Sequence, residues 1–213
     1  MGLRLIVLRH GETDWNREGR YQGCIDTPLS ARGRAQAAAA AHALSRSSLG
    51  AVYASPLARA RETAEAIARP HGLAVRPREA LNEICHGAWE GLTVEEVQAA
   101  FPDLYLLWRE SPEAVTMPDG EGLAQVEERV SGEIGRLQAL HATETICLVS
   151  HDVPVRLLIL GALGLPRERL WSVGLAATGL TEIEYGPEWA RLCRLNGVGH
   201  LGELMASSAH RAH

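Results

Sequence analysis

The segment Leu3-Arg4-Leu5-Ile6-Val7-Leu8-Arg9-His10 decides the fold class of this chain of 213 residues. Its apolar run, residues 3–8, places apolar side chains on both faces of an extended backbone, as expected of a strand buried within a sheet. Further short apolar runs alternate along the chain with longer segments of helical period. This alternation predicts an α/β fold with a mainly parallel central sheet.

The same pattern predicts where the strands and helices lie. The predicted strands are residues 3–8, 51–54, 74–76, 145–150, 181–185 and 190–195. The predicted helices are residues 31–47, 58–69, 94–101, 123–142 and 153–164. Three of the helices follow residues of types favoured at the N-cap, namely Ser30, Thr93 and Asp152. No linker or repeat divides the chain, so we expect one domain, residues 1–205, and a tail, 206–213, that frays.

Charge and composition limit the partners of the protein. A net charge of -5 at pH 7 offers no basic field, so we expect no nucleic acid and no membrane as a partner. Residues 3–8 are too few for a secretory signal, and residues 157–165 fall far short of a bilayer span of ~20 residues. The four cysteines form no CxxC pair, so we expect free thiols in a cytoplasmic protein, with Cys147 and Cys193 in buried strands.

Candidate catalytic residues follow the ends of predicted strands. Arg9 and His10 come directly after the first strand, and His151 follows the fourth. The two histidines would face one crevice at the carboxyl edge of the sheet if these strands are neighbours, which the sequence leaves open. Arg59 lies in the first turn of the helix after the second strand, where free N–H groups, a partial positive charge and a guanidinium together predict an anion site.

Motifs along the whole chain surround these residues. They are Arg9-His10-Gly11-Glu12-Thr13 with Asn16, Gln22-Gly23 with Asp26 and Pro28-Leu29-Ser30, the Ser55, Arg59, Thr63 segment, Glu83 ahead of Gly87-Ala88-Trp89-Glu90-Gly91, and Val149-Ser150-His151. By these motifs the chain resembles the histidine phosphatase superfamily, also called phosphoglycerate mutase-like, from about Leu3 to Leu201. The resemblance implies a three-layer α/β/α sandwich with a mainly parallel central sheet.

The resemblance also implies a role for each matching residue. His10 would attack phosphorus in line and become a phosphohistidine, and Glu83 would protonate the leaving oxygen and then accept a proton from water. The phosphoryl oxygens would be held by Arg9, Arg59 and His151, with a hydrogen bond from Asn16. We place Gln22, Gly23 and Asp152 with Asn16 among the residues that bind the phosphate.

The physical chemistry of phosphate esters supports these roles independently. Positioning and charge stabilisation dominate the catalysis of phosphoryl transfer, and two arginines with a histidine provide both. His10 must attack as neutral imidazole, which a reference pKa of ~6.5 allows. Glu83 must instead carry a proton, so its pKa has to rise about two units above the reference carboxyl value. Such a rise requires the protein to stabilise the protonated form over the ionised form by roughly 3 kcal/mol.

Two residues depart from the pattern of the family. Asp152 follows His151 where glycine is usual; we expect its side chain to cap the next helix, and its charge either to weaken phosphate binding or to favour a cationic substrate. Gly122 stands where many relatives carry serine.

Three functions compete at this point. The first is a phosphomonoesterase that acts on a small-molecule phosphate ester, the second a cofactor-dependent phosphoglycerate mutase, and the third a non-catalytic phosphate-binding or signalling module. The short stretch 92–118 lacks the covering insertion of the mutases, which favours hydrolysis because water reaches the phosphohistidine more easily. We expect no metal and no cofactor, while the identity of the ester and a homodimer stay open.

Overall fold

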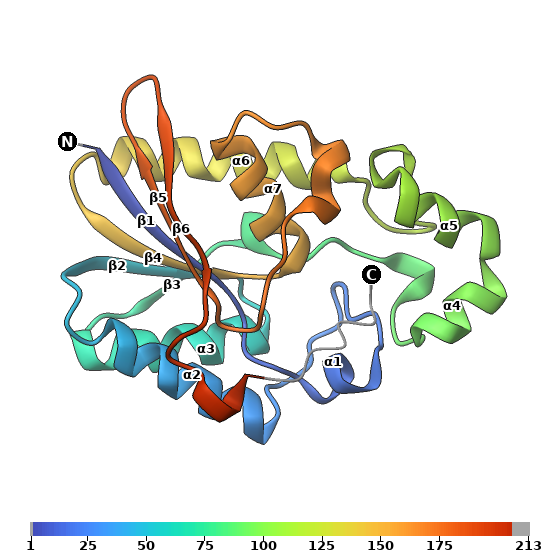
Figure 1. Ribbon diagram of the computed structural model, residues 1–213, viewed down its shortest axis with the longest axis horizontal. Helices are drawn as coiled ribbons and strands as arrows, with labels where there is room; N and C mark the ends of the chain where they lie inside the picture. Colours follow the sequence, from blue (N-terminus) through green and yellow to red (C-terminus); the bar gives the residue numbers. More distant parts are fainter. Residues whose placement is uncertain (1, 206–213) are drawn as a thin grey trace.

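The computed structural model describes residues 2–205, which contain a six-stranded sheet of order β3-β2-β4-β1-β5-β6 (Figure 1). The strands are β1 Leu3–Arg9, β2 Leu49–Ala54, β3 Val75–Pro77, β4 Thr145–Ser150, β5 Leu180–Tyr185 and β6 Ala190–Gly197. The four strands β1, β2, β3 and β4 are parallel to one another. β5 pairs antiparallel with β1, and β6 pairs antiparallel with β5. The predicted mainly parallel sheet is confirmed, and β1 and β4 are neighbours.

Helices cover both faces of this sheet. They are α1 Asp14–Glu18, α2 Ala31–Leu44, α3 Ala58–Ala68, α4 Val94–Ala100, α5 Pro102–Glu110, α6 Leu123–Leu140 and α7 Asp152–Ala162. α2 and α3 lie on one side of the sheet and α6 and α7 on the other (Figure 1). Alternate residues of β1 therefore enter different cores: Ile6 packs with the α2 and α3 side, and Leu5 with the α6 and α7 side. The three-layer sandwich is confirmed.

The structure contains two helices that the sequence pattern did not predict. α1 has only five residues and no apolar stripe, and it forms because Thr13 and Asn16 make a capping box and Gly19 ends it in the left-handed conformation. α5 begins with Pro102 at its first position and fully buries only Trp108. Both helices lie outside the helical ranges predicted from the sequence.

The predicted caps and buried cysteines are partly right. Ser30 and Thr93 cap α2 and α4 as predicted. The N-cap of α7 is His151, so the prediction that Asp152 caps this helix is wrong. Cys147 is buried in β4, but Cys193 is exposed because β6 is an edge strand of the sheet.

Two expectations concern the ends and the surroundings of the chain. The tail predicted to fray, residues 206–213, lies outside the described residues. Among residues 2–205 no helix combines the length and the apolar character needed to cross a membrane.

Candidate active site

The two histidines predicted at strand ends lie together. The backbone N–H of His10 donates to the carbonyl of Ser150 over 2.9 Å, which continues the pairing of β1 with β4 by one residue. The ring centroids of His10 and His151 are 5.1 Å apart and meet edge to face. Both side chains are buried. The adjacency that the sequence left open is therefore present at the carboxyl edge of the sheet.

One hydrogen bond sets the tautomer of His10. Its Nδ1 lies 2.7 Å from the carbonyl oxygen of Gly11, and since a carbonyl only accepts, Nδ1 carries the proton. The lone pair is then on Nε2. Burial lowers the pKa of His10 well below its ordinary value, and the charges of Arg59 and Arg9 lower it further. His10 is thus neutral at pH 7, and Nε2 is the ring nitrogen that carries the lone pair.

Arg59 links the second histidine to the loop after α1. Its Nε donates to Nδ1 of His151 over 3.2 Å, and its two terminal nitrogens donate to the carbonyls of Ile25 at 2.8 Å and Gly23 at 2.7 Å. Because Nδ1 of His151 accepts, Nε2 carries the proton. That buried N–H has no hydrogen-bond partner within residues 2–205. An unpaired buried donor is costly, and an anion bound beside it would satisfy it.

The loop that holds Arg59 depends on glycine at one position. Gly23 has a φ of +51°, and a Cβ on it would lie 2.1 Å from Oε1 of Glu90. Gly23 therefore acts on the site through its carbonyl, which positions Arg59. Burial lowers the pKa of Arg59 to about 10, so its guanidinium remains charged at neutral pH.

The predicted anion site at the N-terminus of α3 is wrong in one respect. A carboxylate of the protein already occupies this end: the Ala58 N–H donates to Oδ1 of Asp26 over 2.6 Å. The positive charge that this segment offers to a ligand therefore comes from the Arg59 side chain, which enters the site from the first turn of α3.

The two predicted amide ligands are held by their oxygens. Oδ1 of Asn16 accepts from the backbone N–H of Thr13 at 3.0 Å, and Oε1 of Gln22 accepts from the hydroxyls of Thr13 at 3.0 Å and Thr27 at 2.5 Å. Gln22 is buried and Asn16 is partly exposed. These contacts orient the amides, whose NH₂ groups are the atoms that can donate to a phosphoryl oxygen.

Glu83 lies against the N-terminus of α7. Its Oε1 accepts from the backbone N–H of Ile84 at 3.0 Å and of Val153 at 3.2 Å, and its Oε2 accepts from that of Asp152 at 3.1 Å. Burial raises the pKa of Glu83, and the neighbouring Asp152 charge raises it further, while Arg59 acts in the opposite direction. A raised carboxyl pKa is what a general acid needs.

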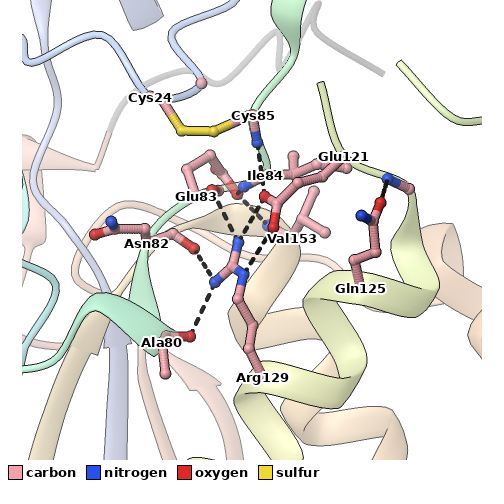
Figure 2. Close-up of polar contacts among 12 residues, drawn as sticks. Cys24, Ala80, Asn82, Glu83, Ile84, Cys85, Glu121, Gln125, Arg129 and Val153 are labelled. Carbon is pink, nitrogen blue, oxygen red and sulfur yellow. Dashed lines mark hydrogen bonds and ion pairs between the residues drawn. A yellow bond between two sulfur atoms is a disulfide. The ribbon is translucent and has the colours of Figure 1, made fainter. Parts of the chain in front are cut away.

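Arg129 on α6 positions the backbone around Glu83, and it was not identified from the sequence (Figure 2). It ion-pairs with both oxygens of Glu121, through Nε at 3.0 Å and Nη2 at 2.9 Å. The same guanidinium donates to three carbonyls of the segment before α4, those of Ala80, Asn82 and Glu83. Arg129 thereby holds the backbone on which Glu83 is carried. An arginine on a helix resembles a solvated residue, so only the fold reveals this role.

Asp152 makes ion pairs with two arginines. Its carboxylate lies 3.1 Å from Nη1 of Arg9 and 2.8 Å from Nε of Arg156. Both Asp152 and Arg156 are buried. The carboxylate of Asp152, which stands where glycine is usual, is therefore neutralised by arginines of the protein, and one of these is Arg9.

The expectation that the cysteines are free thiols is wrong for two of them. Cys24 and Cys85, 61 residues apart, form a disulfide, which no short sequence spacing indicates. With Glu90 they also form the one group of three potential metal ligands among the described residues, with ligand atoms within 4.8 Å of one another. Because the two sulfurs are bonded to each other, they are not thiolate ligands in this state.

The buried histidines predict a loss of stability in acid. Burial lowers the pKa of His86 to about 3, whereas the unfolded value is ~6.5. Below pH ~6.5 His86 is protonated in the unfolded chain but stays neutral in the folded chain, so the free energy of unfolding falls as the pH drops. Between pH 7 and pH 5 this costs about 2 kcal/mol. In urea unfolding at the two pH values, we expect His86→Phe to lose about 2 kcal/mol less than the parent.

The matched control changes an exposed histidine. His42→Gln on α2 should lose as much stability between pH 7 and pH 5 as the parent. A His86→Phe protein with the same pH dependence as the parent would show that His86 is not held neutral.

Comparison with known proteins agrees with this geometry. The family model described as "Histidine phosphatase superfamily (branch 1)" matches residues 5–197. The chain is 39% identical to "Phosphoserine phosphatase 1" of Hydrogenobacter thermophilus over 99% of each protein. It is 32% identical to "Adenosylcobalamin/alpha-ribazole phosphatase" of Escherichia coli over 91% of this chain and 96% of that protein.

Solved structures show the same fold. "Bacillus stearothermophilus YhfR" superposes with a TM-score of 0.90 at 31% identity, covering 93% of this chain and 99% of that one. The vanadate complex of mycobacterial glucosyl-3-phosphoglycerate phosphatase Rv2419c has a TM-score of 0.85 at 31% identity, covering 92% and 99%. The chain belongs to the histidine phosphatase superfamily, branch 1, and is a phosphomonoesterase of that superfamily.

Proposed function

We propose that this chain hydrolyses a small phosphate ester through a phosphohistidine formed on His10. The observation that carries the proposal is the pair of buried rings with opposite roles. Nε2 of His10 bears a lone pair because Nδ1 is bonded to Gly11, and Nε2 of His151 bears a proton without a partner among residues 2–205. A phosphoryl group between them would meet a nucleophile on one ring and a donor on the other.

The reaction then has two balanced steps. In the first, the Nε2 lone pair of His10 forms the N–P bond, the bond from phosphorus to the ester oxygen breaks, and Glu83 gives its proton to that oxygen. In the second, water attacks phosphorus, the N–P bond breaks, and Glu83 takes a proton from the water. The alcohol and inorganic phosphate leave, and both residues return to their starting states.

Positive charge would stabilise the three equatorial oxygens in both steps. The guanidinium groups of Arg9 and Arg59 lie next to His10 and contribute to its lowered pKa. Three of the five N–H groups of Arg59 bond to the protein, which leaves its other donors for the phosphoryl group. The uncharged NH₂ groups of Asn16 and Gln22 would donate further hydrogen bonds to the phosphoryl oxygens.

We propose phosphoserine as the first substrate to test. Support comes from the relative named "Phosphoserine phosphatase 1", which this chain matches over 99% of both lengths. Phosphate release from phosphoserine, α-ribazole phosphate, glucosyl-3-phosphoglycerate and 3-phosphoglycerate should be compared at equal concentrations, with His10→Ala as the control. Release by His10→Ala, or interconversion of phosphoglycerates that requires an added bisphosphoglycerate, would contradict the proposal.

Further proposals complete this assignment. We place the protein in the cytoplasm, as a single domain over residues 1–205 with neither nucleic acid nor membrane as a partner, and we class it as an acid-type phosphatase because Glu83 must be protonated. Light scattering of the purified chain tests the homodimer that the sequence leaves open.

The charge of Asp152 predicts a shift in the pH profile. Asp152 raises the pKa of Glu83, so Asp152→Asn lowers it and Glu83 loses its proton at lower pH. We expect the alkaline limb of kcat/KM to move to lower pH by about one unit. Rates measured across pH 5 to 9 check this, with the exposed Glu65→Gln on α3 as the control. An unmoved limb in Asp152→Asn would show that this charge does not govern Glu83.

A further inference from the structure

The Cys24–Cys85 disulfide joins the two segments that carry the active site (Figure 2). Cys24 lies between Gly23 and Ile25, whose carbonyls both accept from Arg59. Cys85 follows Glu83 by two residues. The covalent bond therefore connects the backbone that orients the phosphate-binding arginine to the backbone that carries the proposed general acid.

One carboxylate also connects these two segments, and the backbone of Tyr21 pairs with that of Gly91 and Leu92. Oε1 of Glu90 accepts the backbone N–H of Cys24 at 2.9 Å and that of His86 at 3.0 Å. Cys85 is held on its other side, where its N–H donates to Oε2 of Glu121 at 3.0 Å. Without the disulfide, Cys24 itself would keep one hydrogen bond to this segment, the one to Glu90, and the backbone pairing of Tyr21 lies three residues before it in the chain.

Exposure separates this pair from one of the two free cysteines, Cys147. Cys24 and Cys85 are both partly exposed, so a small thiol can reach the bond. Cys147 is buried in β4, and burial raises the pKa of its thiol to about 12, which makes it inert. Cys193 is exposed on β6, at the edge of the sheet.

We propose that Cys24 and Cys85 form a reversible thiol–disulfide exchange site that controls the phosphatase activity. A thiolate of a dithiol reductant attacks one sulfur and releases the other as a cysteine thiolate, and the second thiol of the reductant then resolves the mixed disulfide. The products are two cysteine thiols and the oxidised reductant, and a disulfide oxidant reverses the exchange. Disulfides in cytoplasmic proteins are commonly transient or redox-sensing, which agrees with this role.

Reduction is expected to lower activity because it loosens the relative placement of Arg59 and Glu83, an inference that rests on the roles proposed for them. Displacement of about 1 Å in a catalytic group can cost ~100-fold in rate. Since the Glu90 and Glu121 hydrogen bonds remain, we expect a smaller loss of roughly 10-fold in kcat/KM. Loss of the cross-link should also lower Tm by about 5–15 °C.

The test compares oxidised and dithiothreitol-treated protein on the best phosphate ester, with EDTA present throughout. Alkylation after denaturation should count two thiols in the oxidised protein and four after reduction, since two of the four cysteines are free. Wild type and Cys193→Ser should lose activity on reduction and regain it on reoxidation. Cys24→Ser should have the low activity and Tm of the reduced form whether or not dithiothreitol is added.

Several results would overturn the proposal. These are four thiols in the air-oxidised protein, equal kcat/KM in the two redox states, or a Cys24→Ser protein as active and as stable as the oxidised wild type. Inhibition of the reduced protein that appears only when zinc replaces EDTA would assign the pair to metal binding instead. An oxidised wild type that fails to hydrolyse any ester, or a His10→Ala protein that hydrolyses one, would instead contradict the proposed function.

Discussion

Replacement of His10 by alanine is expected to lower kcat/KM on the order of 10⁵-fold, the scale of loss seen when a covalent nucleophile is removed. His10 is buried and neutral, and Nε2 is its one nitrogen not bonded to Gly11. Alanine removes the atom that would form the N–P bond but leaves the arginines in place. Stopped assays of phosphate release over hours, with phosphoserine or the best ester of the panel, measure the residual rate.

Binding should survive this substitution. The affinity of His10→Ala for inorganic phosphate, measured by calorimetry, is expected to stay within about 10-fold of the parent value because charge-assisted contacts from arginine dominate it. The matched control is His42→Ala on the exposed face of α2, which should keep full activity. A His10→Ala protein with more than about 1% of the parent rate would contradict the nucleophilic role of His10.

Replacement of Glu83 by glutamine should cost about 10²–10⁴-fold in kcat/KM for an alkyl phosphate such as phosphoserine. The loss should be far smaller for p-nitrophenyl phosphate, because nitrophenolate leaves without a proton. kcat/KM is the right quantity since it reports the first step, in which we propose that Glu83 acts as the acid. The difference between the two esters therefore isolates proton donation.

The pH profile gives an independent readout of the same variant. The pKa of Glu83 is raised, mainly by burial, so the protonated acid persists above the usual carboxyl range and is lost as pH rises through the raised value. The alkaline limb of kcat/KM for the alkyl ester should be present in the parent and absent in Glu83→Gln. The exposed Glu79→Gln, in the same segment, is the control. Equal losses on both esters would assign Glu83 a structural role.

The layers of the fold were predictable because strands and helices impose different periods on the sequence. The predicted strand 145–150 has the same bounds as β4, and the predicted strand 3–8 ends one residue before β1 does. α1 was not predictable from period, since its five residues are held by a capping box rather than an apolar face. α5 was not predicted either; it is short, begins with Pro102 and fully buries only Trp108.

The site was predictable where a side chain follows the end of a strand. Arg9, His10 and His151 needed only the adjacency of β1 and β4, which is a property of the topology. Contacts between distant segments were not predictable. The Asp26 carboxylate at the start of α3 removes an anion site that the helix end alone suggested. The bond between Cys24 and Cys85 spans 61 residues.

The contacts of Arg129 on α6 were also not predictable, because they join distant segments. Its charge is common on helices, and its hydrogen bonds to the carbonyls of Ala80, Asn82 and Glu83 depend on how that segment crosses the helix. Backbone acceptors leave no pattern in side-chain sequence. Residues that position a catalytic group through its backbone are therefore the ones that sequence reasoning misses.

Direct trapping of the covalent intermediate tests the central claim most sharply. Protein mixed with ³²P-labelled substrate is quenched within milliseconds in alkali, where phosphohistidine survives, and the labelled peptide is sequenced by mass spectrometry. The account predicts acid-labile phosphate on His10 in the parent and no label in His10→Ala. Label on another residue, acid-stable label, or full turnover without any trapped phosphate would contradict it.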